Sequence, residues 1–367
     1  MAGHFLLSAK ARDFTLEHVE KMTAKAVHDY FVHARWGASG LAGRPTCPEC
    51  GTIDKHYWIA SRKQWRCRSI ACMRVFSVTS ETAFADHKLP LKKILRAMMI
   101  FNMNVKGISA LSMARQLGVA YQTAFVLLHK IRESITRAVN KEPLQGLVHM
   151  DGAHVSGKVR KPRVKLPTTK MQARDRYPAD AFPRHPNRRI VMAIREVWPE
   201  KGKGAKRTII GIVFSEDSAS IQRLAQRYVA EGATMHTDEL AGYTKLSKLF
   251  RHRSVNHSRE FSTDDGVSNN QAESFFSRVR RFIIGQAHRV TPHYMYEYMN
   301  EMAWREDTRR DPPSQQLATL AGLAMKWSSL KWRGYWAGKD RPFKVRVDGY
   351  ANRSLDDPEL QQLNFKG

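Results

Sequence analysis

The sequence predicts an α/β protein, in which a core built on a mixed β-sheet follows a cysteine-containing ribbon and a segment of helices. Two observations lead to this prediction. All four cysteines fall between residues 47 and 72. From residue 146 onward, short apolar stretches typical of β-strands replace the helical periodicity of the preceding segment. The ribbon and the helices therefore come first, and the sheet follows them.

Charge and composition narrow the classes of partner. Lys and Arg number 61 against 34 Asp and Glu, which gives a formal net charge of +27 spread along 367 residues. Such an excess suits a polyanion, because binding to phosphates releases counterions, although a ribosome-associated or merely basic protein is the alternative. The sequence has no apolar run long enough to span a membrane, and its N-terminal apolar stretch is too short for a signal peptide. We therefore expect a cytoplasmic protein without a membrane partner.

Residues 1–44 have a helical pattern that ends in a glycine-rich loop, and residues 45–86 form the predicted ribbon. Cys47 and Cys50 have the spacing of a zinc knuckle, whereas Cys67 and Cys72 are spaced more widely. In a reducing compartment, two close pairs favour one structural Zn2+ ion over disulfides. Two short strands, 56–59 and 63–66, are expected between the pairs. The ribbon contacts DNA or serves only as a structural clip.

Residues 87–142 are predicted to be helical and to contain a helix-turn-helix. A helix over 91–103 precedes a short helix over 109–117, Gly118 provides the turn, and a second amphipathic helix starts at Tyr121. That helix would present four side chains to a DNA groove: Tyr121, Gln122, Thr123 and Lys130. The same pattern also occurs in plain helical bundles.

Residues 143–308 are predicted to form an RNase H-like core. Strands are expected at 146–155, 189–198 and 207–214, a helix at 218–231, a strand at 233–238, a short helix at 243–250 and a strand at 254–257. A longer helix follows from about residue 269. In a core with this order the first and fourth strands lie side by side. Residues 158–188 interrupt it as a basic, proline-rich insert, and 309–367 form a basic tail that contains tryptophans.

Three carboxylates, Asp151, Asp238 and Glu273, each lie at the edge of an apolar stretch in this core. Three carboxylates that converge can hold two divalent metal ions, whereas separately each would be read as a capping or surface acid. Arg280 follows Glu273 by two helical turns, so both are expected on one face of the helix together with Asn270. This face would combine a metal ligand with a cation for a phosphate.

The chain resembles bacterial insertion-sequence transposases of the DDE type, in the branch with an N-terminal zinc ribbon and an RNase H-like (ISXO-like) catalytic domain. The resemblance rests on short motifs distributed over about residues 20 to 308: Cys47-Pro-Glu-Cys50-Gly51, Trp65-Arg66-Cys67, Met150-Asp151-Gly152, His236-Thr237-Asp238 and Asn270-Gln-Ala-Glu273-Ser-Phe275. The second cysteine pair is wider than in this branch, and the tail after residue 308 has no counterpart.

The resemblance implies a catalytic role for the acids. Asp151, Asp238 and Glu273 would bind two Mg2+ (or Mn2+) ions, with Asn270 as the alternative third ligand, and Arg280 would brace the phosphate. His154 and His257 would orient water or phosphate, or are plain surface histidines. The implied reaction is cleavage of double-stranded DNA at the element's ends, followed by transfer of the freed 3′-hydroxyl into target DNA.

The implied protein is nucleoid-associated, bacterial and at least a dimer when it synapses two DNA ends. Two alternatives remain open. One is a catalytically silent DNA-binding protein derived from a transposase, which would use only the ribbon and the helix-turn-helix. The other is an RNase H-like nuclease or resolvase, which would share the core without needing the ribbon.

Overall fold

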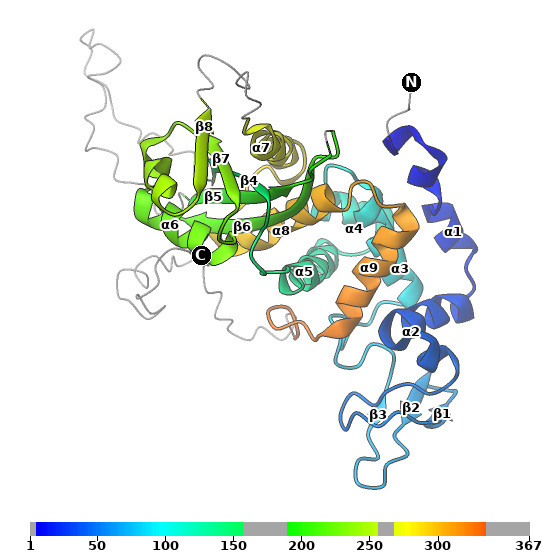
Figure 1. Ribbon diagram of the computed structural model, residues 1–367. Coiled ribbons are helices and arrows are strands. Elements are labelled where there is room, and N and C mark those ends of the chain that lie inside the picture. The colour runs from blue at the N-terminus through cyan, green and yellow to red at the C-terminus, as the bar shows by residue number, and fades with distance from the viewer. Residues whose placement is uncertain (1–4, 157–188, 201, 256–267, 335–367) are drawn as a thin grey trace, which may run out of the picture. The chain divides into compact units, whose positions relative to one another are not determined.

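The computed structural model describes residues 5–156, 189–200, 202–255 and 268–334 (Figure 1). Two compact units are described separately below. The helical unit comprises the chain up to Asn140, together with Ile284–Ala287 and the described residues from Asn300 onward. The α/β unit comprises Lys141–Ile283 and His288–Met299 within the described ranges. None of the described helices is long and apolar enough to cross a membrane.

The helical unit begins with two short 3-10 helices, Phe5–Leu7 and Ala9–Arg12, followed by α1 (Leu16–Lys21) and α2 (Ala24–Leu41). The Thr23 hydroxyl caps α2 by accepting a hydrogen bond from the Ala26 amide at 3.2 Å. The ribbon follows as an antiparallel sheet of β1 (Tyr57–Ile59), β2 (Gln64–Arg66) and β3 (Val75–Phe76). The two expected strands are thereby confirmed, and β3 is a third.

Aromatic side chains join the ribbon to α2. Trp65 of β2 is 8% exposed and lies edge-on against Trp36 of α2, with ring centroids 5.5 Å apart. The Arg35 guanidinium donates to the carbonyls of Ser77 and Val78, at 3.2 and 2.7 Å. The ribbon therefore shares a hydrophobic core with the helix before it.

Two helices joined by a short turn, α4 (Ala110–Leu117) and α5 (Tyr121–Arg137), follow α3 (Leu91–Met103) where the helix-turn-helix was predicted. Gly118 ends α4 in the left-handed conformation, φ +60°, which favours glycine at this position. The Ser109 hydroxyl caps the other end of α4 by accepting from the Ser112 amide.

A helix absent from the prediction, α9 (Pro313–Lys326), lies in the segment that the sequence suggests is a basic tail. Its apolar residues recur at helical spacing and are buried in the core of the helical unit: Leu317, Leu320, Ala321 and Ala324. Pro313 occupies its first turn, where a missing amide proton costs nothing. This apolar stripe is the feature from which the sequence could have predicted the helix.

The α/β unit is built on a five-stranded mixed sheet in the order β6-β5-β4-β7-β8 (Figure 1). The strands are β4 (Leu147–Ser156), β5 (Arg189–Val197), β6 (Ala205–Val213), β7 (Thr234–Asp238) and β8 (Arg251–Val255). β4 pairs antiparallel with β5 and parallel with β7, so the first and fourth strands of the core lie side by side as predicted. The mixed α/β class is confirmed.

The helical elements of this unit are α6 (Ser218–Tyr228), the 3-10 helix Ala241–Lys248, α7 (Asn270–Phe282) and the first half of α8 (Pro292–Asp307). β8 spans 251–255 and not the expected 254–257. Its charged residues resemble a loop in sequence, but an edge strand tolerates them because one of its sides is unpaired.

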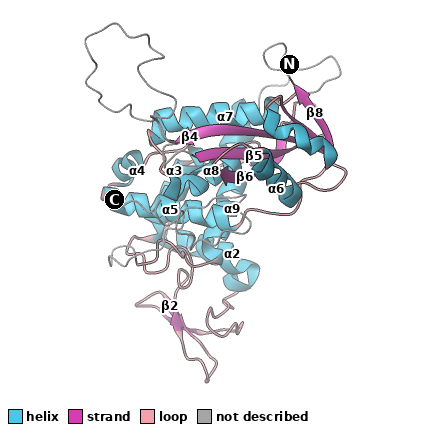
Figure 2. Ribbon diagram, turned by 90° about the vertical axis from the view of Figure 1, so that its left-hand side faces the viewer, coloured by secondary structure: helices cyan, strands magenta, loops and turns pink. Residues whose placement is uncertain are grey.

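The two faces of this sheet have different covers. On one face, Val148, Met150 and Met192 form a hydrophobic core with Ile221 and Leu224 of α6. On the other face, α7 lies along β4 and β5 (Figure 2). Arg195 of β5 donates to the Gln271 carbonyl of α7 at 2.6 Å. Side chains of β4 alternate between these covers, so neighbouring residues face different environments.

Candidate functional site

The four cysteines of the ribbon come together. Their sulfurs all lie within 4.8 Å of one another, with Cys47 3.8 Å from Cys72 and Cys50 3.6 Å from Cys67. A zinc tetrahedron with Zn–S bonds of about 2.3 Å has edges of about 3.8 Å, so the cluster fits one Zn2+ ion. Although Cys67 and Cys72 are spaced more widely in sequence, their sulfurs therefore still lie at distances that suit one zinc ion.

Asp151 and Asp238 lie level with each other on adjacent parallel strands. His149 of β4 pairs with His236 of β7, and each aspartate comes two residues later on its strand. The two histidine rings are 5.4 Å apart, which places both on the same face of the sheet. Because side chains two residues apart share a face, both carboxylates project on the α7 side of strands about 5 Å apart.

The electrostatics of Asp151 reflect its acidic neighbours. Burial, followed by the charges of Asp238, Glu216 and Glu273, raises the pKa of Asp151 to about 7, although a hydrogen bond from the Gly152 amide acts in the opposite direction. An acid whose charge is opposed by burial and like charges favours a bound cation. Within the described ranges, however, no three carboxylate oxygens of different residues come as close as the cysteine sulfurs do.

Glu216, which precedes α6, is an acid that the sequence analysis missed. It hydrogen-bonds with the Tyr243 hydroxyl, and burial followed by the charge of Asp238 raises its pKa. A Cβ added to Gly152 would lie 2.6 Å from the Cδ of Glu216, so the carboxylate fills the space where a side chain would be. Glu216 thus lies against β4 on the α6 side, beside Asp151. No motif marks it, because its position depends on packing against a distant glycine.

Helix α7 brings Glu273 toward the acids. Glu273 is half-buried in the first turn of α7, and its charge acts on Asp151. Asn270, the first residue of the helix, and Arg280, in its last turn, are both exposed. Among the predicted residues of this helix, Glu273 is the one whose charge is felt at Asp151.

Asn269 holds the start of α7 against β4. The side chain is fully buried and donates to the Met150 carbonyl at 3.2 Å, directly before Asp151. Asn269 occupies the N-cap position of α7, but its side chain makes no capping hydrogen bond. Only the fold reveals its contact with β4.

Two buried histidines line the same face beside the aspartates. Burial lowers the pKa of His149 to about 3 and lowers that of His236, whose Nδ1 is 3.2 Å from the Ser268 carbonyl. Both rings are therefore neutral near pH 7. They fill the space between the sheet and the start of α7 without adding charge.

The predicted DNA-facing residues of α5 divide into two groups. Tyr121 and Gln122 are exposed at the start of the helix, and Thr123 is half-buried. Lys130 is only 4% exposed, and its amine donates to the Ala85 carbonyl at 3.4 Å. The prediction that Lys130 faces a groove is therefore wrong, because by that turn both sides of α5 are covered within the helical unit.

Of the two predicted histidines and the basic insert, only His154 lies within the described residues. His154 is exposed on β4, three residues beyond Asp151. His257 and the basic insert 158–188 lie outside the described residues.

Two family models match the chain, one over the ribbon and one over the segment that contains the mixed sheet. The transposase zinc-ribbon domain matches residues 22–75, and the ISXO2-like transposase domain matches residues 143–307. No curated protein matches the chain. The first match covers the cysteine cluster and the second covers the sheet with its acids. The chain therefore belongs to the IS1595 family of transposases, which join a zinc ribbon to an ISXO2-like transposase domain.

Proposed function

We propose that the protein cleaves DNA at the ends of an insertion sequence in a metal-dependent reaction and transfers the freed 3′-hydroxyl into target DNA. The observation that carries the proposal is the level placement of Asp151 and Asp238 on adjacent strands, with the charge of Glu273 acting on Asp151 from α7. Carboxylates paired on adjacent strands beside a helix-borne acid are suited to phosphodiester chemistry.

Asp151, Asp238 and Glu273 would hold the Mg2+ or Mn2+ ions. Carboxylate oxygens are the ligands that these hard cations prefer, so the donor set fits. When bound, the divalent ions would lower the pKa of the attacking water or hydroxyl and stabilise the negative charge on the leaving oxygen. We favour Glu273 over Asn270 as the third ligand because a carboxylate neutralises the cation and Glu273 already influences Asp151 electrostatically.

The remaining side chains position the reactants. Asn269 fixes the start of α7 on β4 and thereby sets where Glu273 stands relative to Asp151. Arg280, exposed in the last turn of the same helix, would contact the phosphate backbone near the cleaved bond. Tyr121 and Gln122, exposed at the start of α5, would contact the DNA of the element's ends. Synapsis of two ends would require at least two copies of the chain.

The test uses zinc-loaded full-length protein and DNA that carries the inverted repeats flanking its gene. With Mg2+ we expect nicked ends and joined strand-transfer products, whereas Asp151→Asn should lose both by a factor of at least about 1000. Asp29→Asn, on an exposed side of α2, is the matched control and should retain activity.

Each outcome separates a different reading. Cleavage that persists unchanged in Asp151→Asn refutes the catalytic assignment. Cleavage without strand transfer would instead point to a nuclease or resolvase. Binding of the repeats without any chemistry would indicate a silent DNA-binding protein.

A further inference from the structure

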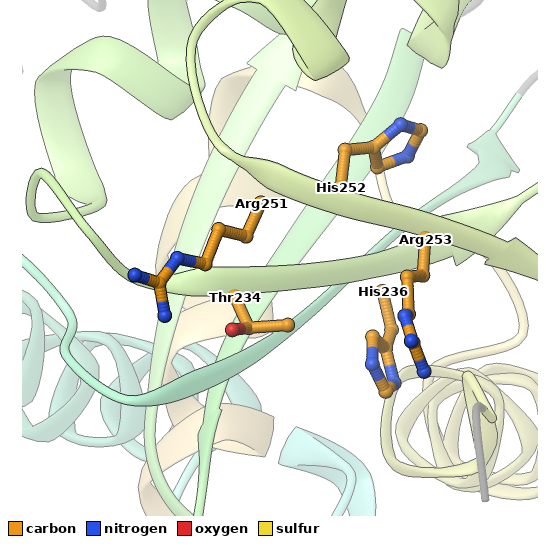
Figure 3. Close-up of a pocket in the computed structure, with 5 residues that line it drawn as sticks. All are labelled: Thr234, His236, Arg251, His252 and Arg253. Carbon is orange, nitrogen blue, oxygen red and sulfur yellow. The ribbon is translucent and has the colours of Figure 1, made fainter. Parts of the chain in front are cut away.

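A hollow of about 320 Å³ lies on β7 and β8, at one edge of the sheet of the α/β unit. Its lining comes from β7 and β8: Thr234, His236, Arg251, His252 and Arg253. In the parallel register Thr234 pairs with Arg251 and His236 with Arg253, so these four side chains share one face. Figure 3 shows the two arginines, Thr234 and His236 on one side of β8, with His252 on the other. The His252 ring, accordingly, meets Thr237 at 2.8 Å.

Both arginines are available to a ligand. Arg251 and Arg253 are exposed, and within the described part of the chain neither guanidinium group forms an ion pair or a hydrogen bond. Alternate residues of a strand stand about 7 Å apart, so two guanidinium groups line one edge of the hollow as a pair of separate cations. A guanidinium presents a planar set of donors that matches a phosphate in two-pronged contacts.

The hollow opens on the same face of the sheet as the catalytic acids. His236, in its wall, precedes Asp238 by two residues, and Arg253 is its partner on β8. Asp238 therefore projects on this face about 7 Å farther along β7. An acidic cluster repels the polyanion on which it is proposed to act, so DNA needs cations beside the cluster on the same face.

We propose that Arg251 and Arg253, with the Thr234 hydroxyl, form a binding site for the DNA backbone that holds phosphates next to the one to be cleaved. This inference rests on the proposed function, because it assigns the DNA of that reaction to this edge of the sheet. His236 is buried and serves as the wall of the site. The arginines of β8 thereby position the DNA strand so that it reaches Asp238.

The test measures how the affinity for DNA depends on salt. Zinc-loaded full-length protein is titrated into a short fluorescent duplex of arbitrary sequence, without Mg2+, over a series of salt concentrations. Loss of two phosphate contacts should reduce the slope of log K against log salt by about 2 in Arg251→Gln/Arg253→Gln, and by about 1 in either single variant. The Arg251→Lys/Arg253→Lys protein keeps both charges and should retain the slope.

The matched control is Arg223→Gln/Arg227→Gln, which removes the same charge from exposed positions of α6, on the other face of the sheet. Its slope should equal that of the unaltered protein. An unchanged slope in the Arg251/Arg253 variants overturns the proposal, and so does an equal fall in the α6 control, which would mean that only net charge matters.

A second measurement separates this site from the proposed chemistry. Asp238→Asn should abolish Mg2+-dependent cleavage and keep the salt slope. If the unaltered protein cleaves nothing, yet the Arg251/Arg253 variants lose slope, the backbone site stands and the proposed function falls. If cleavage depends on Asp238 while the arginine variants keep their slope, the function stands and the backbone site falls.

Discussion

The absence of a side chain at Gly152 lets Glu216 lie against β4 on the side opposite to Asp151. Asp151 projects from β4 toward α7, and the next residue, Gly152, leaves room on the opposite side for the Glu216 carboxylate. Tyr243 fixes that carboxylate with a hydrogen bond. Burial, followed by the charges of Glu216, Asp151 and Asp238, raises the pKa of Tyr243 well above its usual value. The acids therefore form one electrostatic group on both sides of β4.

Replacement of Gly152 by alanine tests this arrangement. The new methyl group would overlap the Glu216 carboxylate, so Glu216 must move and lose its hydrogen bond with Tyr243. We expect Gly152→Ala to lower the free energy of unfolding of the α/β unit by about 1–3 kcal/mol. Urea unfolding, followed by the far-ultraviolet circular dichroism of the zinc-loaded protein, measures this change.

A double-mutant cycle identifies the cause. In a Glu216→Ala background the methyl group has space, so Gly152→Ala should cost less than about 0.5 kcal/mol there. Gly285→Ala is a control in the helical unit, where a Cβ meets no atom within 4 Å, and it should leave the unfolding of the α/β unit unchanged. Equal costs with and without the Glu216 side chain would show that the strain arises elsewhere.

How far sequence predicts single residues depends on what fixes them. Asp151 and Asp238 could be predicted because strand periodicity places them and the pairing of the first and fourth strands brings them level. Glu216 could not, because its place depends on contact with Gly152 and Tyr243, which are distant in sequence. Lys130 was misplaced because helical periodicity does not say which side of α5 other helices cover.

At the scale of elements, buried charges fix the helices of the helical unit. Glu301 of α8 is fully buried, with its carboxylate 2.6 Å from Arg132 of α5 and 2.8 Å from Arg305. The Arg305 guanidinium also donates to the carbonyls of Phe101 and Asn104 at the end of α3. The charges of the two arginines lower the pKa of Glu301 against the effect of burial. Three helices thus meet at one carboxylate.

Removal of this charge should be costly. Glu301→Gln leaves two buried arginines without their counter-charge, so we expect a loss of about 3–5 kcal/mol in the free energy of unfolding of the helical unit. Chemical denaturation followed by tryptophan fluorescence measures it, with Trp304 beside the network. The control is Asp29→Asn, which breaks an exposed ion pair with Lys25 and should cost at most about 1 kcal/mol. A loss for Glu301→Gln as small as that of the control would contradict this account.

Most elements could be predicted because each has a local signal. Gly118 marks the end of α4, β4 to β6 alternate or run apolar, and Pro90 with Leu91 opens α3. α9 has a stripe of leucines and alanines, yet the surrounding tryptophans and basic residues suggested a tail. The edge strand β8 begins earlier than expected, because a charged segment can still pair with a neighbouring β-strand.

At the scale of the molecule, the two units have separate cores and separate stabilising elements. The ribbon shares its core with α2, where His28 and Trp36 meet Trp65 at ring distances of 5.6 and 5.5 Å. The acids belong to the other unit, around a core of β-strands and α6. Zinc should therefore stabilise the part of the chain that includes the ribbon, while the sheet depends on its own packing.

Removal of zinc tests this division. Without the ion, four sulfurs within 4.8 Å of one another lose the bonds that hold the ribbon, and Cys67, whose pKa burial raises, becomes a neutral thiol. We expect a chelator to increase amide hydrogen exchange across residues 45–86 and to alter the near-ultraviolet dichroism of the tryptophans, whereas the amides of β4 and β5 keep their protection. Added Zn2+ should reverse the change and Mg2+ should not. Cys72→Ser should mimic the chelator, while Ile70→Ser, at a 91% exposed position of the same loop, should not. If β4 and β5 lose protection as fast as the ribbon does, the units do not unfold separately and zinc holds the whole chain together.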